Sequence, residues 1–289
     1  MPLERRRVTD GLLLVTAIAA VSTSAPLVRE AAAPALCLAF WRTTLGASAT
    51  APFAYRQHAH VDRRRRRLIG IAGVVLAAHF ATWIASLSYT SVASAVTLVS
   101  TQPAWAALFA PQPVHRRVWT GIGVAMVGVI AIAGVDLSIS ARAVFGDGLA
   151  LAGGALAALY VTVGAEVRQT VPNATYTTGC YAIAAVTALV FALIGRVNIV
   201  PADAATWGWI LAITIGPQLL GHTLINAVLQ RLDAVLVSVA ILFEIVGASL
   251  IAWWWFGETP PAALYPAAAL LLAGVVLVIS GTREAAPVD

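Results

Sequence analysis

Charged residues are scarce in this chain of 289 residues, and lysine is absent altogether. Only 11% of the residues are charged, whereas a soluble globular domain carries roughly 25%. Hydrophobic residues make up 60% of the chain and its mean hydropathy is +0.86, a composition that indicates an integral membrane protein. A helix needs about 20 apolar residues to cross a hydrocarbon core of roughly 30 Å, so ten such helices would leave no sizeable soluble domain.

Cysteine is equally rare, and the motifs of several enzyme classes are missing. Cys37 and Cys180 stand alone in separate apolar runs, which excludes a disulfide framework or a cysteine-based zinc site. The sequence has no HExxH zinc motif, no GxSxG nucleophile elbow and no GxxxxGKS/T loop for ATP. We therefore expect no catalytic residues, no metal, no cofactor and no ATP. An intramembrane enzyme or a channel stays open as a weaker alternative.

Long apolar runs between short polar breaks predict ten membrane-spanning helices. Their approximate ranges are 11–29, 34–55, 68–88, 92–110, 118–135, 147–165, 174–195, 206–228, 233–256 and 262–281. With the N-terminus in the cytoplasm, fourteen arginines fall on that side and only Arg29, Arg142 and Arg196 on the other, with Arg42 inside a helix. This bias predicts a bacterial-type inner membrane protein with both termini cytoplasmic. Arginines in cytoplasmic loops also explain the calculated pI near 9.8, so the basic charge does not indicate a nucleic-acid-binding protein.

Weak internal similarity indicates that the chain is built from two halves. The first predicted helix opens Asp10-Gly-Leu-Leu-Leu14 and the sixth opens Asp147-Gly-Leu-Ala-Leu151. Gln102 in the fourth lies 142 positions before Glu244 in the ninth. A chance match between alanine-rich helices is the alternative. Because five helices per half is an odd number, true repeats would be inverted relative to each other. We expect the two domains to be residues 1–140 and 141–289.

Four motifs, in this order, carry a resemblance to a known family. They are Ser22-Thr-Ser-Ala-Pro-Leu-Val-Arg29, Phe40-Trp-Arg42, Tyr89-Thr-Ser-Val-Ala-Ser-Ala-Val96 followed by Pro103, and Phe256-Gly-Glu-Thr-Pro260. With them the chain resembles the EamA-like branch of the drug/metabolite transporter superfamily, and within it the aromatic amino acid exporter type. The resemblance covers roughly residues 10–281.

The resemblance implies an all-α integral membrane fold, with ten transmembrane helices in two inverted five-helix repeats around a central cavity. Helices one, three, four, six, eight and nine would line that cavity. The implied activity is export of neutral or aromatic amino acids, or of similar amphipathic metabolites, by alternating access; a multidrug or organic-cation exporter is the alternative. The expected partners are a small-molecule substrate and membrane lipids, with the chain acting as a monomer. One departure matters: the family usually places proline after the polar residue of helix nine, but Ile245 follows Glu244. This weakens the expectation of a break there.

Ionisable side chains at membrane depth are candidates for function, because each costs about 2.5–3.5 kcal/mol on insertion scales. Glu244 sits midway along the ninth predicted helix and would hold a substrate amino group, carry a proton, or bond to a neighbouring helix. His79 and Trp83, four apart, share a helix face that suits an amphipathic ligand. His79 is also a candidate proton carrier, and its structural alternative is a bond to a neighbouring backbone.

Polar and aromatic side chains on other helices complete the predicted site. Gln102 and Trp105 share a face, and Pro103 would bend the helix as a gating element. Tyr160 and Thr23 fall at matching mid-depth positions, although serine and threonine hydroxyls commonly bond back to their own helix. His222 and Asn226, four apart, would line the inner half of the cavity. The family resemblance implies a structural or gating role for Arg42, and we expect it to pair with backbone carbonyls or with Glu30 near the outer surface.

Overall fold

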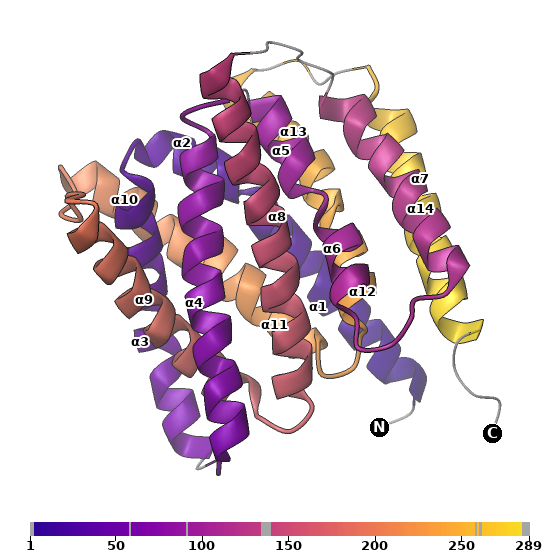
Figure 1. Cartoon of the computed structure of the whole chain (residues 1–289), viewed down its shortest axis with the longest axis horizontal. Helices are drawn as coiled ribbons and strands as arrows, with labels where there is room; N and C mark the ends of the chain where they lie inside the picture. Colours follow the sequence, from indigo (N-terminus) through magenta and orange to yellow (C-terminus); the bar gives the residue numbers. More distant parts are fainter. Residues whose placement is uncertain are drawn as a thin grey trace.

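The computed structural model describes residues 3–57, 59–90, 92–133, 140–257, 259 and 262–284, and within these ranges the chain is helical without a strand. Figure 1 shows a bundle in which α1 begins and α14 ends at the same end of the molecule. In chain order the helices are α1 (Leu3–Ser22), α2 (Ser24–Ala31), α3 (Ala35–Gln57), α4 (Arg63–Ser86), α5 (Val92–Val99), α6 (Gln102–Phe109), α7 (Arg116–Ala133), α8 (Ala141–Arg168), α9 (Asn173–Ile194), α10 (Ala204–Ile213), η1 (Thr214–His222), α11 (Thr223–Val228), α12 (Ala234–Ile241), α13 (Phe243–Phe256) and α14 (Leu264–Glu284).

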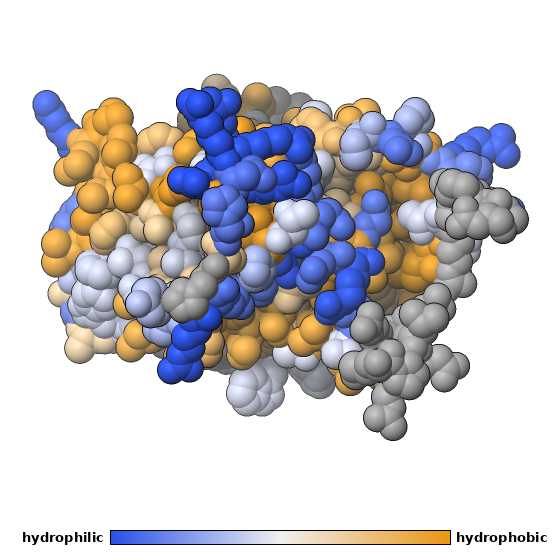
Figure 2. All heavy atoms as spheres, turned by 90° about the horizontal axis from the view of Figure 1, so that it is seen from below, coloured by the Kyte–Doolittle hydropathy of each residue, from blue (hydrophilic) through white to orange (hydrophobic). Residues whose placement is uncertain are grey.

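The outside of the bundle is suited to lipid. Within the described residues, seven helical stretches are long and apolar enough to cross a membrane: Val8–Ala31, Arg63–Ser86, Ala141–Arg168, Asn173–Ile194, Ala204–Val228, Ala234–Trp255 and Leu264–Thr282. Large apolar side chains such as Leu12, Leu193 and Trp254 are exposed. Hydrophilic side chains gather on the end of the bundle seen in Figure 2, flanked by hydrophobic ones. The chain is therefore a multi-pass membrane protein.

Several predicted helices are interrupted in the structure, and the one expected at 11–29 divides at Thr23 into α1 and α2. The helix expected at 92–110 divides into α5 and α6, because Pro103 has no N–H to bond the carbonyl of Val99. The helix expected at 233–256 divides at Leu242, although no proline follows Glu244. There the N–H groups of Leu242 and Ile245 each bond the carbonyl three residues back, at 3.2 Å, which tightens the turn. The break that the missing proline made less expected is therefore present.

A π-helical segment replaces regular α-helix between α10 and α11. This segment, η1, contains Pro217, whose ring removes one backbone donor and disfavours the ordinary four-residue bond. The wider coil keeps Gln218 completely buried. The side chain of Gln218 therefore points into the bundle, although the sequence predicted one continuous apolar helix here.

The main helix pairs each join a segment from before residue 134 to one from after residue 140. The pairs are α7 with α14, α3 with α9, α4 with α8, α1 with η1, and α6 with α12. Two glycines allow α7 and α14 to lie very close: a Cβ at Gly121 would be 2.7 Å from the carbonyl oxygen of Gly274, and a Cβ at Gly274 equally close to that of Gly121. Small residues permit such contact where no hydrophobic effect drives helices together.

Some predicted features fall outside the described part of the chain. Glu258 and Pro260 of the motif after the ninth predicted helix are among them, as are the side chains of Arg5, Arg6 and Arg7. Of the same motif, Gly257 is described and has a positive φ of 67°, a left-handed conformation that glycine adopts without strain.

Candidate functional site

A cavity of about 120 Å³ lies inside the bundle. Its walls come from α1, α2, α4, α5, α6, α8, η1, α11, α12 and α13, which are the six stretches that the resemblance implied. The lining residues are Val21, Ser24, Ala25, His79, Phe80, Trp83, Val99, Ser100, Gln102, Ala157, Tyr160, Val161, His222, Ile225, Ile241, Leu242, Glu244, Ile245 and Ala248. Most are apolar or aromatic, with a few polar groups among them, as is usual for small-molecule sites.

His79 and Trp83 form one aromatic wall on α4. Their rings are stacked, with centroids 6.3 Å apart and an interplanar angle of 9°. His79 Nδ1 lies 2.9 Å from the carbonyl oxygen of Gly153. Because a carbonyl only accepts, Nδ1 carries the proton and Nε2 of the neutral imidazole is left as an acceptor. The backbone bond and the cavity position that the sequence offered as alternatives for His79 therefore hold together.

Two hydrogen bonds fix polar side chains on other walls. The amide of Gln102 donates from Nε2 to Ser238 Oγ at 3.2 Å, which ties α6 to α12. Asn226 donates from Nδ2 to the hydroxyl of Tyr160 at 2.6 Å. Tyr160 lines the cavity, whereas Asn226 is completely buried behind it. Asn226 is thus placed to orient the tyrosine and does not itself line the cavity.

Glu244 lines the cavity from the first turn of α13, two residues after the break at Leu242. Among the described residues no group donates a hydrogen bond to its carboxylate, although the positive charge of Arg42 acts on it. A carboxylate that faces an apolar cavity without a donor is suited to a proton or a cationic group of a ligand. Glu244 is the one acidic residue among those that line the cavity.

Trp105, Thr23 and Pro103, like Asn226, lie outside the lining. Trp105 donates from Nε1 to Thr101 Oγ1 at 3.1 Å. Thr23 bonds back to the carbonyl of Ala20 at 2.7 Å, as serine and threonine hydroxyls commonly do. Pro103 is buried at the start of α6 beside Gln102. Thr23 and Pro103 both stand at helix breaks, which gives them a part in shaping the cavity walls.

The predicted partners of Arg42 were wrong. Arg42 is only 1% exposed, and its Nε donates to Gln218 Oε1 at 2.8 Å instead of to Glu30 or to backbone carbonyls. Its guanidinium carbon lies 4.0 Å from the ring centroid of Phe80. The physical reason is the π-helical segment η1, which brings the side chain of Gln218 to α3. Arg42 is therefore part of the bundle interior.

Polar bonds, which we call closures, join separate segments at both ends of the bundle. At the end that carries the start of α1, Arg231 binds Asp10, with Nη2 2.6 Å from Oδ1. The Asp10 carboxylate, by accepting hydrogen bonds, raises the pKa of the Arg231 guanidinium. At the opposite end Thr90 donates to Asp147 Oδ1 at 2.6 Å. Asp10 and Asp147 are the matching residues of the two similar helix starts, so related positions form both closures.

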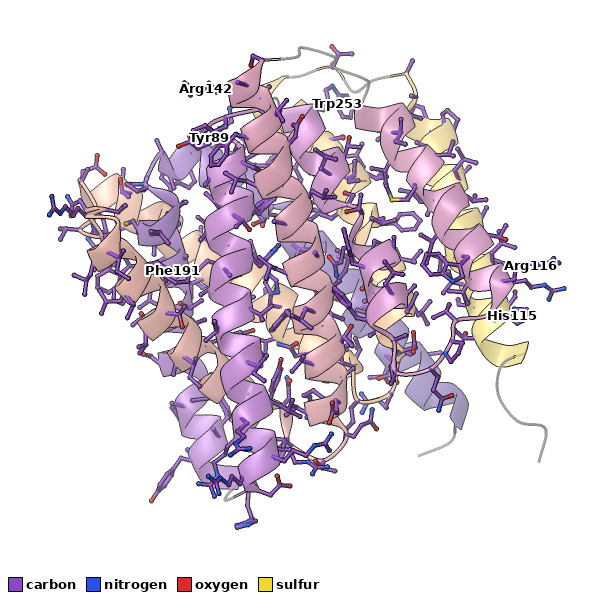
Figure 3. All side chains as sticks on the ribbon, in the orientation of Figure 1. Tyr89, His115, Arg116, Arg142, Phe191 and Trp253 are labelled. Carbon is purple, nitrogen blue, oxygen red and sulfur yellow. The ribbon has the colours of Figure 1, made fainter. Side chains whose placement is uncertain are left out.

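An arginine also reinforces the second closure. Arg142 donates from Nη2 to the carbonyl of Ser88 at 2.7 Å, and its guanidinium lies 5.4 Å from the ring centroid of Tyr89. Figure 3 shows Arg142 and Tyr89 close together at one end of the bundle, away from Arg116. This end is thus held by a hydroxyl–carboxylate hydrogen bond and a cation–π contact, whereas the end at Asp10 is held by an ion pair.

Sequence reasoning missed several residues of the interior. Phe80 is one of them: it lines the cavity and meets the ring of His222, which the sequence did predict to line it, edge to face with centroids 5.4 Å apart. Gln218 and Ser238 supply side-chain partners to Arg42 and Gln102. Gln218 directly follows Pro217 in an apolar run, and that polar residue beside a proline was the signal available.

Arg168 lies beyond the helix predicted at 147–165, yet it is buried at the end of α8. It donates from Nε to the carbonyl of Asn226 at 2.8 Å and also binds the carbonyl of Val171. These bonds tie the end of α8 to α11. Within the described residues no three His, Cys, Asp or Glu side chains come together in a way that could hold a metal ion.

Comparisons with known proteins agree with this architecture. The model of the EamA-like transporter family matches the chain twice, over residues 10–134 and 144–280. One crystal structure of a protein has a similar fold, with a TM-score of 0.78 and 20% sequence identity. The match covers 96% of this chain and 99% of that one. A search of curated proteins finds none that matches.

Proposed function

The chain belongs to the EamA-like transporter family, whose model covers nearly its whole length, and from this we propose that it exports neutral or aromatic amino acids, or similar amphipathic metabolites. Membrane transport of small molecules follows from the family. The substrate class is our proposal, and the single observation that carries it is the make-up of the cavity. His79 and Trp83 provide an aromatic wall, and Gln102 and Glu244 provide polar groups in the same space.

A ligand that fits this cavity has an apolar body and a polar end. An aromatic ring would pack on the stacked His79 and Trp83 rings, a contact worth about 0.5–1.5 kcal/mol beyond area burial. The amide of Gln102 and the free Nε2 of His79 would bond its polar end. An α-amino group would lie at the Glu244 carboxylate, which has no hydrogen-bond donor among the described residues. Asn226 would hold the Tyr160 hydroxyl in place for the same ligand.

We propose ten membrane crossings in two inverted five-helix domains, residues 1–140 and 141–289. The two separate matches of the family model support the division. So does the pairing of helices across it, because α3 with α9, α7 with α14 and α6 with α12 are each a pair of equivalent positions in such repeats. Three helical stretches beyond the seven apolar ones, α3, α5 with α6, and α7, would complete the ten.

The proposed location is a bacterial-type inner membrane, with both termini in the cytoplasm. The arginine bias supports this orientation, because basic residues concentrate in cytoplasmic loops. Arg63 to Arg67 at the start of α4 and Arg231 would then lie at the cytoplasmic side, and Arg142 at the opposite side. We propose that the transporter acts as a monomer, with lipids as its surroundings.

Alternating access would work through the two closures. In this proposal the Asp10 and Arg231 ion pair closes the cytoplasmic end, and the Thr90 and Asp147 bond closes the outer end. The helix breaks at Thr23, Pro103 and Leu242 would be the hinges, because an irregular turn absorbs changes in backbone angle. Each closure would open in turn while the other stays formed.

An organic-cation exporter is the second candidate. Its support is Glu244, a carboxylate at an aromatic-lined cavity, which would bind a cation without a carboxylate of its own. This candidate predicts substrates such as aromatic quaternary amines in place of amino acids.

Counterflow in proteoliposomes tests the proposal. Purified protein would be reconstituted with unlabelled amino acid inside and labelled neutral or aromatic amino acids outside, with and without a pH gradient. Saturable exchange that falls on replacement of Gln102 by alanine is the expected result. Absence of amino acid exchange by folded protein, together with exchange of organic cations, would instead favour the second candidate.

A further inference from the structure

The interior contains a cluster of hydrogen-bond donors that have no acceptor. Arg42 Nη1, Arg42 Nη2 and Gln218 Nε2 are fully buried, and none has a partner among the described residues. They account for three of the seven buried side-chain polar atoms in this condition. The two side chains are joined to each other, because Arg42 Nε donates to Gln218 Oε1 at 2.8 Å. The one acceptor atom of the glutamine side chain takes part in that bond, so the atoms of the pair that lack a partner are all donors.

This cluster adjoins the cavity at Phe80. The guanidinium carbon of Arg42 is 4.0 Å from the centroid of the Phe80 ring, and Phe80 itself lines the cavity. Neither Arg42 nor Gln218 is among the lining residues. On the cavity side, His222 meets the Phe80 ring edge to face at 5.4 Å. The phenyl ring therefore contacts both the donors and the cavity, and its rotation would join the two.

The unpaired N–H groups of Arg42 and Gln218 are suited to bind an anion. A buried donor without a partner is unfavourable, and more so when it is charged. The stacked Phe80 ring stabilises the positive charge through its face, but it does not accept the N–H groups that point along the guanidinium plane. The planar fork of an arginine matches the two oxygens of a carboxylate, and a neighbouring amide donor adds a third bond.

No described side chain accepts a hydrogen bond from these donors. The charge of Arg42 acts on Glu244 and on His79 and His222, yet none of these bonds to it. Tyr181 bonds the backbone oxygen of Gln218 and the hydroxyl of Thr223, so it does not serve Gln218 Nε2. The Arg42 guanidinium and the Glu244 carboxyl are not joined by a hydrogen bond, so the two groups would complement the two charged ends of a zwitterion.

We infer that Arg42 and Gln218 form a carboxylate-binding subsite behind Phe80, which takes the carboxylate of a zwitterionic substrate whose amino group lies at Glu244. The inference rests on the proposed export function and deepens it, because it requires both charged ends of an amino acid. The bonds formed would be from Arg42 Nη1 and Nη2 and from Gln218 Nε2 to the two carboxylate oxygens. Phe80 would turn aside to admit them.

Ligand discrimination by the purified protein tests the subsite. The melting temperature in detergent would be measured with phenylalanine, with phenylalaninamide, which lacks the carboxylate, and with sodium chloride alone. Phenylalanine is expected to raise the melting temperature, and the amide at the same concentration is not. A site built for a group rejects an analogue without it strongly, so we expect at least about a tenfold difference in apparent affinity. Equal shifts by both ligands would overturn the subsite, and an equal shift by chloride alone would overturn its use for substrate.

Gln218→Glu separates a binding role from a structural one. The variant keeps the bond to Arg42 and places a permanent carboxylate on it, so it is expected to melt higher without ligand and to lose the phenylalanine shift. Its counterflow of phenylalanine should fall at least about tenfold. Full retention of phenylalanine binding would overturn the subsite. Gln169→Glu, an exposed position at the end of α8, is the matched control and should behave as the unaltered protein.

A second variant and a second readout keep the outcomes distinct. If Gln218→Glu does not fold, Arg42→Lys retains the charge without the fork, and is expected to lose the preference for phenylalanine over its amide. Phenylalanine that stabilises the protein but is not exchanged in proteoliposomes would overturn the export function and leave the subsite standing. Exchange of phenylalanine and its amide at equal rates would overturn the subsite and leave export standing.

Discussion

Asp10 and Arg231 are 221 residues apart in the chain and form a two-point ion pair at one end of the bundle. Arg231 Nε lies 2.8 Å from one carboxylate oxygen of Asp10 and 2.9 Å from the other. The pair ties the start of α1 to the turn between α11 and α12. It therefore joins two segments that would have to separate if the cavity opened at this end.

Asp10→Asn should open this end more often. The Arg231 side chain is 44% exposed, so solvent screens the pair and its contribution is about 0.5–1 kcal/mol. The closed population should fall by about two- to fivefold relative to the open one. The measurement is labelling of a cysteine at Ser100, which lines the cavity, by a membrane-impermeant thiol reagent after Cys37 and Cys180 are replaced by alanine.

The double variant Asp10→Arg with Arg231→Asp is the control for the ion pair. Reversal of the two charges keeps the attraction, so labelling should return toward that of the parent. If Asp10→Asn leaves labelling from the side of the termini unchanged, the ion pair is not a closure.

Thr90→Val should affect labelling from the other side. The threonine hydroxyl donates to Asp147 at 2.6 Å, and a hydrogen bond to a charged group contributes about 1.5–3 kcal/mol. Its loss should raise labelling of the same cysteine by about tenfold or more, from the side that carries Arg142. Thr120→Val, which removes a hydroxyl bonded only to its own helix, should leave labelling unchanged. Equal labelling from both sides in Thr90→Val would contradict the assignment.

Glu244→Gln should remove the effect of a pH gradient on exchange, if transport is coupled to protons. Glu244 faces the cavity without a hydrogen-bond donor among the described residues, so it is free to take up a proton or a substrate amine. His79 is anchored by its Nδ1 to Gly153, and His79→Gln should keep the gradient effect while it weakens substrate binding. Exchange by both variants would be measured with the inside pH higher, equal and lower. A gradient effect that survives in Glu244→Gln but is lost in His79→Gln would reverse the two roles.

Apolar run lengths and arginine placement were enough to predict a helical multi-pass membrane protein. The length of an apolar run indicates whether a helix can cross the membrane. The family resemblance added which helices line the cavity. The break at Leu242 could not be predicted in this way, because no proline or glycine marks it. Hydrogen-bond geometry at this turn depends on packing between helices.

The partner of Arg42 shows the same limit for the site. Gln218 is 176 positions away, and it bonds Arg42 from the π-helical segment η1, which the sequence did not predict. Sequence spacing places residues on a helix face but does not say which other helix that face meets. Residues that share a helix, such as His79 and Trp83, were therefore easier to bring together than residues on different helices.

Gly121→Val should destabilise the contact between α7 and α14. A Cβ at this position would lie 2.7 Å from the carbonyl oxygen of Gly274 and 2.9 Å from a methyl group of Val278, so the two helices would have to move apart. Overpacking of this kind costs about 1–3 kcal/mol, and the melting temperature in detergent should fall accordingly. Gly123→Val on the same helix is the matched control, because a Cβ at Gly123 meets nothing within 4 Å. Equal melting temperatures for the two variants would mean that the helices do not approach as closely as their glycines allow.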